Sequence, residues 1–194
     1  MATRRPREAD TAKTRQHIIA ATDILISKKG LSATSVSAVA RMLEMSHANV
    51  YRHFKSRNDL LIAVAETWMS ETRTACEKTY DPNASVADNL EALVFAIRTE
   101  LLRRADNVAA LELYHFALEH MPDSALEHHK HRASLVAKII GASEPTVPVL
   151  NALRAFTDPV LLLATESEDI TNQISDLCRL LETGLQKASD TAAV

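Results

Sequence analysis

Glycine and aromatic residues are both scarce in this chain of 194 residues. Only three glycines occur, whereas average usage is about 7%. This scarcity argues against a turn-rich all-β fold, a glycine-rich phosphate loop and a dinucleotide-binding fingerprint. Aromatic residues make up 4% of the chain, while alanine and leucine are abundant. Because alanine and leucine lose little side-chain entropy in a helix, the composition favours helices.

Cysteines and long apolar runs are also rare. The two cysteines, Cys76 and Cys178, have no partner motif, which argues against a disulfide scaffold or a cysteine-based zinc site and favours two small core residues. No apolar run approaches the roughly 20 residues of a membrane span. The basic, polar N-terminus has no apolar stretch behind it that would indicate a signal peptide. We therefore expect a cytoplasmic protein that does not contact a membrane.

Charge is divided unevenly along the chain. The formal net charge is −3, but residues 1–57 carry eleven Lys and Arg against four acidic residues, and the remainder carries eleven basic and twenty-one acidic residues. The first segment is therefore +7 and the rest −10. A basic segment joined to an acidic body suggests that the first part contacts a polyanion, although a solvated surface is the alternative.

The spacing of apolar residues predicts helices almost throughout and no strand. Hydroxyl residues followed three positions later by an acid indicate helix starts at Ser56, Ser85 and Ser124. Pro159 should kink or divide an apolar helix. The expected helices cover about 11–28, 36–43, 47–52, 57–80 and the segments opening at Ser85, Asn107 and Ser124, followed by 146–164 and 169–187.

Residues 34–61 have the spacing of a helix-turn-helix. Val36, Val39 and Leu43 would face a small core, and Glu44-Met45-Ser46 would form the turn. Ser46 can cap the second short helix, which Val50 and Phe54 would anchor from inside. The outer face would then carry small and polar residues suited to base edges in the major groove, although an ordinary helical hairpin has the same spacing.

Residues 12–65 resemble the N-terminal signature of the tetracycline-repressor (TetR) family. The resemblance is carried by Arg15-x-x-Ile18-Ile19-x-Ala21, Gly30, Thr34-Ser35-Val36, Val39-Ala40, Ser46, Tyr51-x-His53-Phe54-x-Ser56-Arg57 and Leu60-Leu61. It implies an all-α fold of about nine helices, with a helix-turn-helix DNA-binding domain at 1–57 and a ligand-binding and dimerisation domain at 58–194. Glu44 stands where the family often has glycine, so a left-handed backbone there would be strained.

The resemblance also implies roles for individual residues. A dimeric repressor would bind a near-palindromic operator and leave it when a small-molecule effector binds. His47, Ala48 and Asn49 would read bases, while Tyr51, His53 and Arg57 would contact phosphates. Hydroxyls and helix N-terminal amides around Thr34, Ser35 and Ser37 would bind further phosphates. Arg52 and Lys55 would add nonspecific attraction to DNA, and Ser46 would belong to the same DNA-binding surface. Arg4, Arg5 and Arg7 form either an arm on the DNA or a solvated tail.

The remaining roles lie in the larger, less diagnostic part of the chain. Residues expected at the dimer contact, or alternatively in the protomer's own core, are Leu150, Leu153, Leu161, Ile174, Leu177, Leu181 and Leu185. Apolar rings with a few polar groups are the usual lining of a ligand pocket. The candidates for that pocket, each with plain core packing as the alternative, are Trp68, Phe95, Arg98, Tyr114, Phe116 and Phe156.

A histidine cluster supports a second hypothesis, a metal-responsive regulator. His115, His120, His128, His129 and His131 fall within 17 residues, near Glu112, Glu119 and Glu127. Adjacent His128 and His129 point in different directions on a helix, so a solvated face is favoured over a metal site. The sequence has no nucleophile elbow, Walker loop or His-Glu-x-x-His motif. We therefore expect neither an enzyme nor a cofactor, with a helical scaffold or an unusual enzyme as the remaining alternatives.

Overall fold

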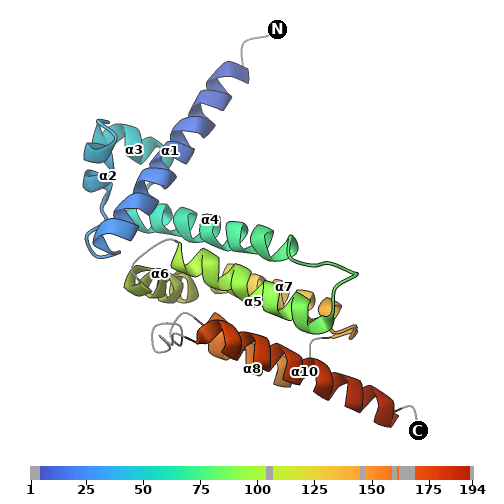
Figure 1. Cartoon of the computed structure of the whole chain (residues 1–194). Coiled ribbons are helices and arrows are strands. Elements are labelled where there is room, and N and C mark those ends of the chain that lie inside the picture. Colours follow the sequence, from blue (N-terminus) through green and yellow to red (C-terminus); the bar gives the residue numbers. More distant parts are fainter. Residues whose placement is uncertain (1–4, 104–106, 145–146, 159–160, 162–168, 193–194) are drawn as a thin grey trace. The chain divides into compact units, whose positions relative to one another are not determined.

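Helices form all the regular secondary structure in the described part of the chain (Figure 1). The computed structural model describes residues 5–103, 107–144, 147–158, 161 and 169–192, and these ranges hold nine helices and no strand. The predicted all-α fold is confirmed. The chain forms two compact units: an N-terminal unit of Met1–Trp68 with Arg104–Pro122, and a C-terminal unit of Met69–Arg103 with Asp123–Val194.

The N-terminal unit contains the first three helices, the start of the fourth and one helix from later in the chain. It is built from α1 (Arg5–Lys29), α2 (Val36–Met42), α3 (His47–His53), the first half of α4 (Arg57–Glu77) and α6 (Asn107–His120). Side chains from several of these helices are fully buried, among them Ile18, Ile26, Val39, Val50 and Leu60. This small core fixes α2 and α3 against α1 and α4, as the helix-turn-helix spacing predicts.

Local capping residues determine where α2, α3 and α4 begin. Ser35 caps α2 by accepting from the Ala38 amide, and Ser46 caps α3 by accepting from the Asn49 amide. Ser56 and Asp59 form the predicted capping box at α4, with two reciprocal hydrogen bonds of 3.1 Å. Because each cap is encoded within four residues, these helix starts could be predicted from the sequence alone.

The turn between α2 and α3 has the expected left-handed residue. Glu44 has φ 54°, the only positive φ at a non-glycine position among the described residues. The Met45 amide donates to the Ala40 carbonyl at 2.9 Å and the Glu44 amide to the Arg41 carbonyl at 3.3 Å. These two bonds form a Schellman motif, in which the left-handed position is usually glycine.

The C-terminal unit is organised around α5 (Val86–Leu102). α10 (Ile170–Ala192) and α8 (Val147–Thr157) both pack on α5, and the unit also holds the second half of α4 and most of α7 (Pro122–Ile139). Its core includes Leu90, Leu93 and Ile174 together with both cysteines. Cys76 and Cys178 are free and buried, which confirms their interpretation as small core residues.

Some predicted helix ends differ from the structure. α1 begins at Arg5 rather than near Thr11, and α4 ends at Glu77. The capping box predicted at Ser124 is wrong, because α7 already begins at Pro122. Proline is favoured in the first turn of a helix, where its missing amide proton costs nothing. Pro159 and Arg4 lie outside the described residues.

The compact units do not follow the predicted boundary at residue 57. The division falls within α4 after Trp68, and α6 groups with the N-terminal helices. The units reflect packing density, whereas the predicted boundary concerns function, so the functional boundary remains a prediction. Within the described ranges, no helix has both the length and the apolar character needed to cross a bilayer.

Candidate nucleic-acid interface

Helix α3 has one buried face and one exposed face. Val50 is 0% exposed and Phe54, the C-cap residue, is 2% exposed. His47, Ala48 and Arg52 are exposed and Asn49 is half-buried. The buried side chains of Val50 and Phe54 therefore anchor the helix, and the residues predicted to read bases lie outside this buried face.

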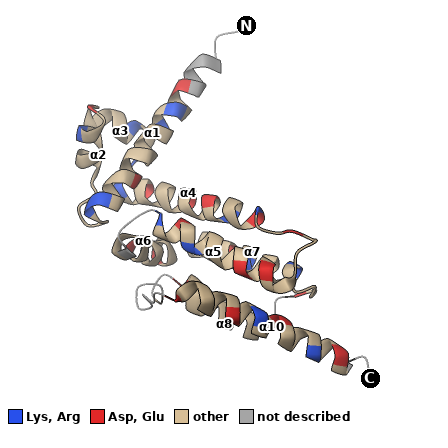
Figure 2. Cartoon of the chain, viewed as in Figure 1, with Lys and Arg blue, Asp and Glu red and all other residues tan. Residues whose placement is uncertain are grey.

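The charges around α3 favour binding of a polyanion. The helix contains no acidic residue, and its last turn carries Arg52 and His53. Exposed Lys55 follows directly, and the ring of Tyr51 is 51% exposed. Figure 2 shows Lys and Arg along α1 and beside α2 and α3, whereas acidic residues recur along α4, α5 and α10. The uneven charge of the sequence is thus present on the folded helices.

The hydroxyl residues at the start of α2 have different surroundings. Ser37 is exposed, and half-buried Ser35 caps the helix. Thr34 is 1% exposed and its hydroxyl donates to the Gly30 carbonyl at 3.0 Å. Thr34 is therefore placed to stabilise the preceding turn, while Ser37 faces solvent.

Arg57 makes contacts within the protein. Its Nε donates to the Thr34 carbonyl at 2.7 Å, and one terminal nitrogen donates to the Leu31 carbonyl at 2.5 Å. The side chain is half-buried, and it links the first turn of α4 to the turn that precedes α2. A guanidinium presents its donors in a fixed planar fork, so these two bonds constrain how it can reach a phosphate.

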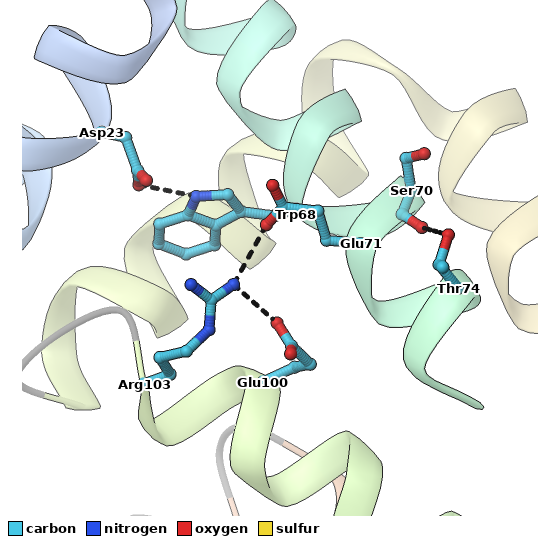
Figure 3. A network of polar contacts seen from close by, with 7 residues as sticks. All are labelled: Asp23, Trp68, Ser70, Glu71, Thr74, Glu100 and Arg103. Carbon is cyan, nitrogen blue, oxygen red and sulfur yellow. Dashed lines mark hydrogen bonds and ion pairs between the residues drawn. The ribbon is translucent and has the colours of Figure 1, made fainter. Parts of the chain in front are cut away.

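Two contacts support the helix-turn-helix although they were not predicted from the sequence. The guanidinium of Arg15 lies 4.8 Å from the centroid of the Phe54 ring. Trp68 donates from Nε1 to the Asp23 carboxylate at 2.7 Å, which joins α4 to α1 (Figure 3). These pairs lie 39 and 45 positions apart in the sequence, and no local pattern marks them.

Comparison with known proteins identifies this arrangement. Residues 18–64 match the family model for bacterial regulatory proteins of the tetR family. That range begins within α1, contains both short helices and ends within α4. Residues 18–64 therefore form the DNA-binding domain typical of the tetR family. Its helix-turn-helix is therefore that of a DNA-binding transcriptional regulator, as the resemblance predicts.

Solved structures share the fold over nearly the whole chain. A tetR-family regulatory protein from Rhodococcus RHA1 has a TM-score of 0.65 and 20% identity, covering 88% of this chain and 97% of that chain. A TetR/AcrR-family regulator from Thermobifida fusca YX-ER1 has a TM-score of 0.63 and 20% identity, covering 86% and 96%. The ketosteroid regulator KstR2 of Mycobacterium tuberculosis has a TM-score of 0.61 and 14% identity, covering 88% and 93%. A search of curated protein sequences gave no significant match.

The candidate residues for a ligand pocket fall into both compact units. Trp68, Tyr114 and Phe116 belong to the N-terminal unit, where Phe116 stacks on His120 at 4.1 Å between ring centroids. Phe95, Arg98 and Phe156 belong to the C-terminal unit. There Phe95 and Phe156 pack half-buried against the core, and Arg98 donates to the Phe156 carbonyl at 3.4 Å.

The dimer candidates differ in how far they are available to a partner. Leu153 and Ile174 are buried in the protomer's own core, at 5% and 0% exposure. Leu161 is 42% exposed, and the remaining candidates pack half-buried against the core: Leu150, Leu177, Leu181 and Leu185. Leu180 on α10 is 70% exposed and was not identified from the sequence. It lies one position away from the predicted stripe, so a search for one apolar face misses it.

The histidine-rich segment does not form a metal centre in the described part of the chain. No group of three or more His, Cys, Asp or Glu side chains there is arranged to hold a metal ion. His131 pairs with Glu77 at 3.2 Å, whereas the buried Nδ1 atom of half-buried His128 has no hydrogen-bond partner among the described residues. Burial, followed by the charge of Arg132, lowers the pKa of His128 to about 3. The segment therefore holds a neutral histidine among cationic groups, and the metal-sensor alternative is not favoured.

Proposed function

We propose that this chain is a dimeric transcriptional repressor that binds a near-palindromic operator and is released by a small-molecule effector. The observation that carries the proposal is the exposed outer face of α3 above the buried Val50–Phe54 anchor. His47 and Asn49 supply groups that hydrogen-bond to base edges, and a recognition helix of this kind reads the major groove. Tyr51, His53 and Lys55 would contact phosphates, with Arg52 and Ser37 at the edge of the interface.

DNA selection tests the base-reading role. A pool of random duplexes is enriched for bound sequences, and the affinity for the best duplex is measured over a range of salt concentrations. We expect two inverted half-sites and an affinity that falls steeply with salt, because phosphate contacts release counterions. A selected pool without symmetry, or an affinity independent of salt, would contradict the proposal.

Two symmetric half-sites require a dimer. We propose that α10 contributes to the dimer contact through Leu180 and the neighbouring Leu177, because an exposed leucine on a packed helix is the apolar surface that a second copy would bury. Leu180→Glu should shift the sedimentation coefficient towards the monomer. Leu126→Glu is the matched control, because Leu126 is also exposed, at 51%, but lies on α7. Equal behaviour of the two variants would remove α10 from the interface.

We place the proposed effector site in the C-terminal unit, against Phe95 and Phe156. Two half-buried rings provide apolar contact, and Arg98 supplies a polar anchor whose pKa is lowered by burial. The effector must bind better to a form whose recognition helices no longer match the half-site spacing. A thermal-shift screen of small organic acids and apolar compounds should give hits that Arg98→Gln weakens and that Arg179→Gln, at an exposed position, does not. Hits that both variants bind equally well would place the effector elsewhere.

A further inference from the structure

We propose that Glu112 of α6 is a positioning residue for DNA binding, and that it acts with Arg57 by holding the turn between α1 and α2 from two sides. The inference rests on the proposed DNA-binding function. Neither side chain needs to touch DNA, since their common target is the backbone of Leu31. This assigns a role in DNA affinity to a helix outside the helix-turn-helix, and an internal role to Arg57.

The turn between α1 and α2 is short and closely packed. Gly30 adopts φ 78°, which ends α1, and its amide donates to the Ile26 carbonyl at 2.8 Å. Leu31 is 9% exposed and Thr34 is 1% exposed. The Thr34 amide donates to the Leu31 carbonyl at 3.1 Å, and its hydroxyl donates to the Gly30 carbonyl. Ser35, the next residue, is the N-cap of α2, so the turn determines where α2 begins.

Glu112 holds the amide side of this turn. Its Oε2 accepts a hydrogen bond from the Leu31 amide at 2.9 Å, across 81 positions of sequence. A Cβ built on Gly30 would lie 3.5 Å from the same oxygen, so the carboxylate sits directly against the backbone of the turn. α6 belongs to the same compact unit as the helix-turn-helix and packs on α1. The carboxylate therefore fixes the position of the turn relative to α6.

Arg57 holds the carbonyl side. It donates to the carbonyls of Leu31 and Thr34, so the peptide groups on both sides of Leu31 are fixed by side chains from different helices. Charged groups make stronger hydrogen bonds than neutral ones. The turn leads directly into α2, which packs on α3, and each helix has a fully buried valine, Val39 on α2 and Val50 on α3. Displacement of the turn would therefore change the placement of the recognition helix.

A positioning role and a purely electrostatic role of Glu112 predict opposite changes in DNA affinity when this residue is replaced. Removal of a negative charge from a DNA-binding unit raises affinity for DNA when only long-range attraction acts. The positioning role instead requires an acceptor for the Leu31 amide. Gln retains an acceptor oxygen on a side chain of the same length, whereas Ala removes it. Glu119 is the matched control, because it is a carboxylate on the same helix whose side chain is 79% exposed.

The experiment combines amide hydrogen exchange at Leu31 with DNA affinity at several salt concentrations. Glu112→Ala should speed exchange of the Leu31 amide by about tenfold and weaken DNA binding by about tenfold, the size expected when one such hydrogen bond is lost. Glu112→Gln should keep both properties close to those of the native chain. Glu119→Ala should leave Leu31 exchange unchanged. Affinity that rises equally in Glu112→Ala and Glu112→Gln would overturn the proposal in favour of charge alone.

Arg57 supplies the second arm of the experiment. As a positioning residue, Arg57→Ala should lower affinity for all duplexes and speed Leu31 exchange, while the slope of log affinity against log salt stays unchanged. A direct phosphate contact would instead reduce that slope by about one unit, and this result would overturn the assignment. If the native chain fails to bind DNA, the proposed function fails, but exchange at Leu31 in free Glu112→Ala still tests the hydrogen bond itself.

Discussion

Replacement of Glu44 by glycine should stabilise the protein, although it removes a side chain from a folded domain. Glu44 is the left-handed residue of the Schellman motif that ends α2, with φ 54°. A left-handed conformation costs an L-residue about 1–2 kcal/mol. Glycine avoids this cost but loses about 0.5–1 kcal/mol through its greater freedom in the unfolded chain. The expected net gain is therefore about 0.5–1 kcal/mol.

The matched control for this prediction is Glu44→Ala. Alanine removes the same exposed carboxylate but retains the Cβ that makes the left-handed conformation unfavourable, so the Gly–Ala difference isolates the backbone effect. Urea denaturation followed by circular dichroism measures that difference as a shift in midpoint at constant slope. A gain of this size corresponds to a rise in melting temperature of about 2 °C for a chain of this length. A glycine variant no more stable than the alanine variant would show that the left-handed backbone at Glu44 carries no such cost.

Three further predictions concern the pH response, the core contacts and base reading. His128 has a pKa near 3 in the fold, from burial and from Arg132, against about 6.5 when unfolded. Its contribution to stability is therefore present above pH 6.5 and lost as pH falls towards 3. About 1 kcal/mol should be lost between pH 7.5 and 5.5, and urea titrations of His128→Leu should lack that loss; the same pH dependence in both proteins would refute it. A double-mutant cycle of Trp68→Phe with Asp23→Ala should give a coupling of about 1–2 kcal/mol from the lost hydrogen bond to a charged acceptor, whereas zero coupling would contradict the contact. Asn49→Ala should weaken operator binding by about 1–3 kcal/mol and relax one base position; an unaltered base preference would exclude Asn49 as a base contact.

The helix-turn-helix could be predicted from the sequence because its signals are local. Ser46 caps α3 through a bond to the residue three positions on, and Val50 and Phe54 lie one helical turn apart. The strained turn at Glu44 was predicted from the resemblance to the family and is confirmed by its φ. These features need only the spacing of neighbouring residues.

The contacts that hold the unit together could not be predicted in the same way. The Leu31 amide and Glu112 lie 81 positions apart, and the partner of a lone glutamate is decided by tertiary packing. The capping box at Ser124 is wrong because Pro122 provides an equally good helix start two residues earlier. Exposed Leu180 shares α10 with buried Ile174, and only the packing of α10 on α5 separates their roles.

We propose that the exposed face of α3 enters the major groove of an operator, once from each copy of the chain. Ala48→Cys allows a DNA-cleaving iron chelate to be attached on that face. The native thiols of Cys76 and Cys178 would not compete, because both are buried and burial raises the pKa of each to about 11. We expect two symmetric clusters of cleavage on the selected duplex, one within each half-site. Cleavage no greater than that from the same reagent on Ser134→Cys, at an exposed position of α7, would contradict it.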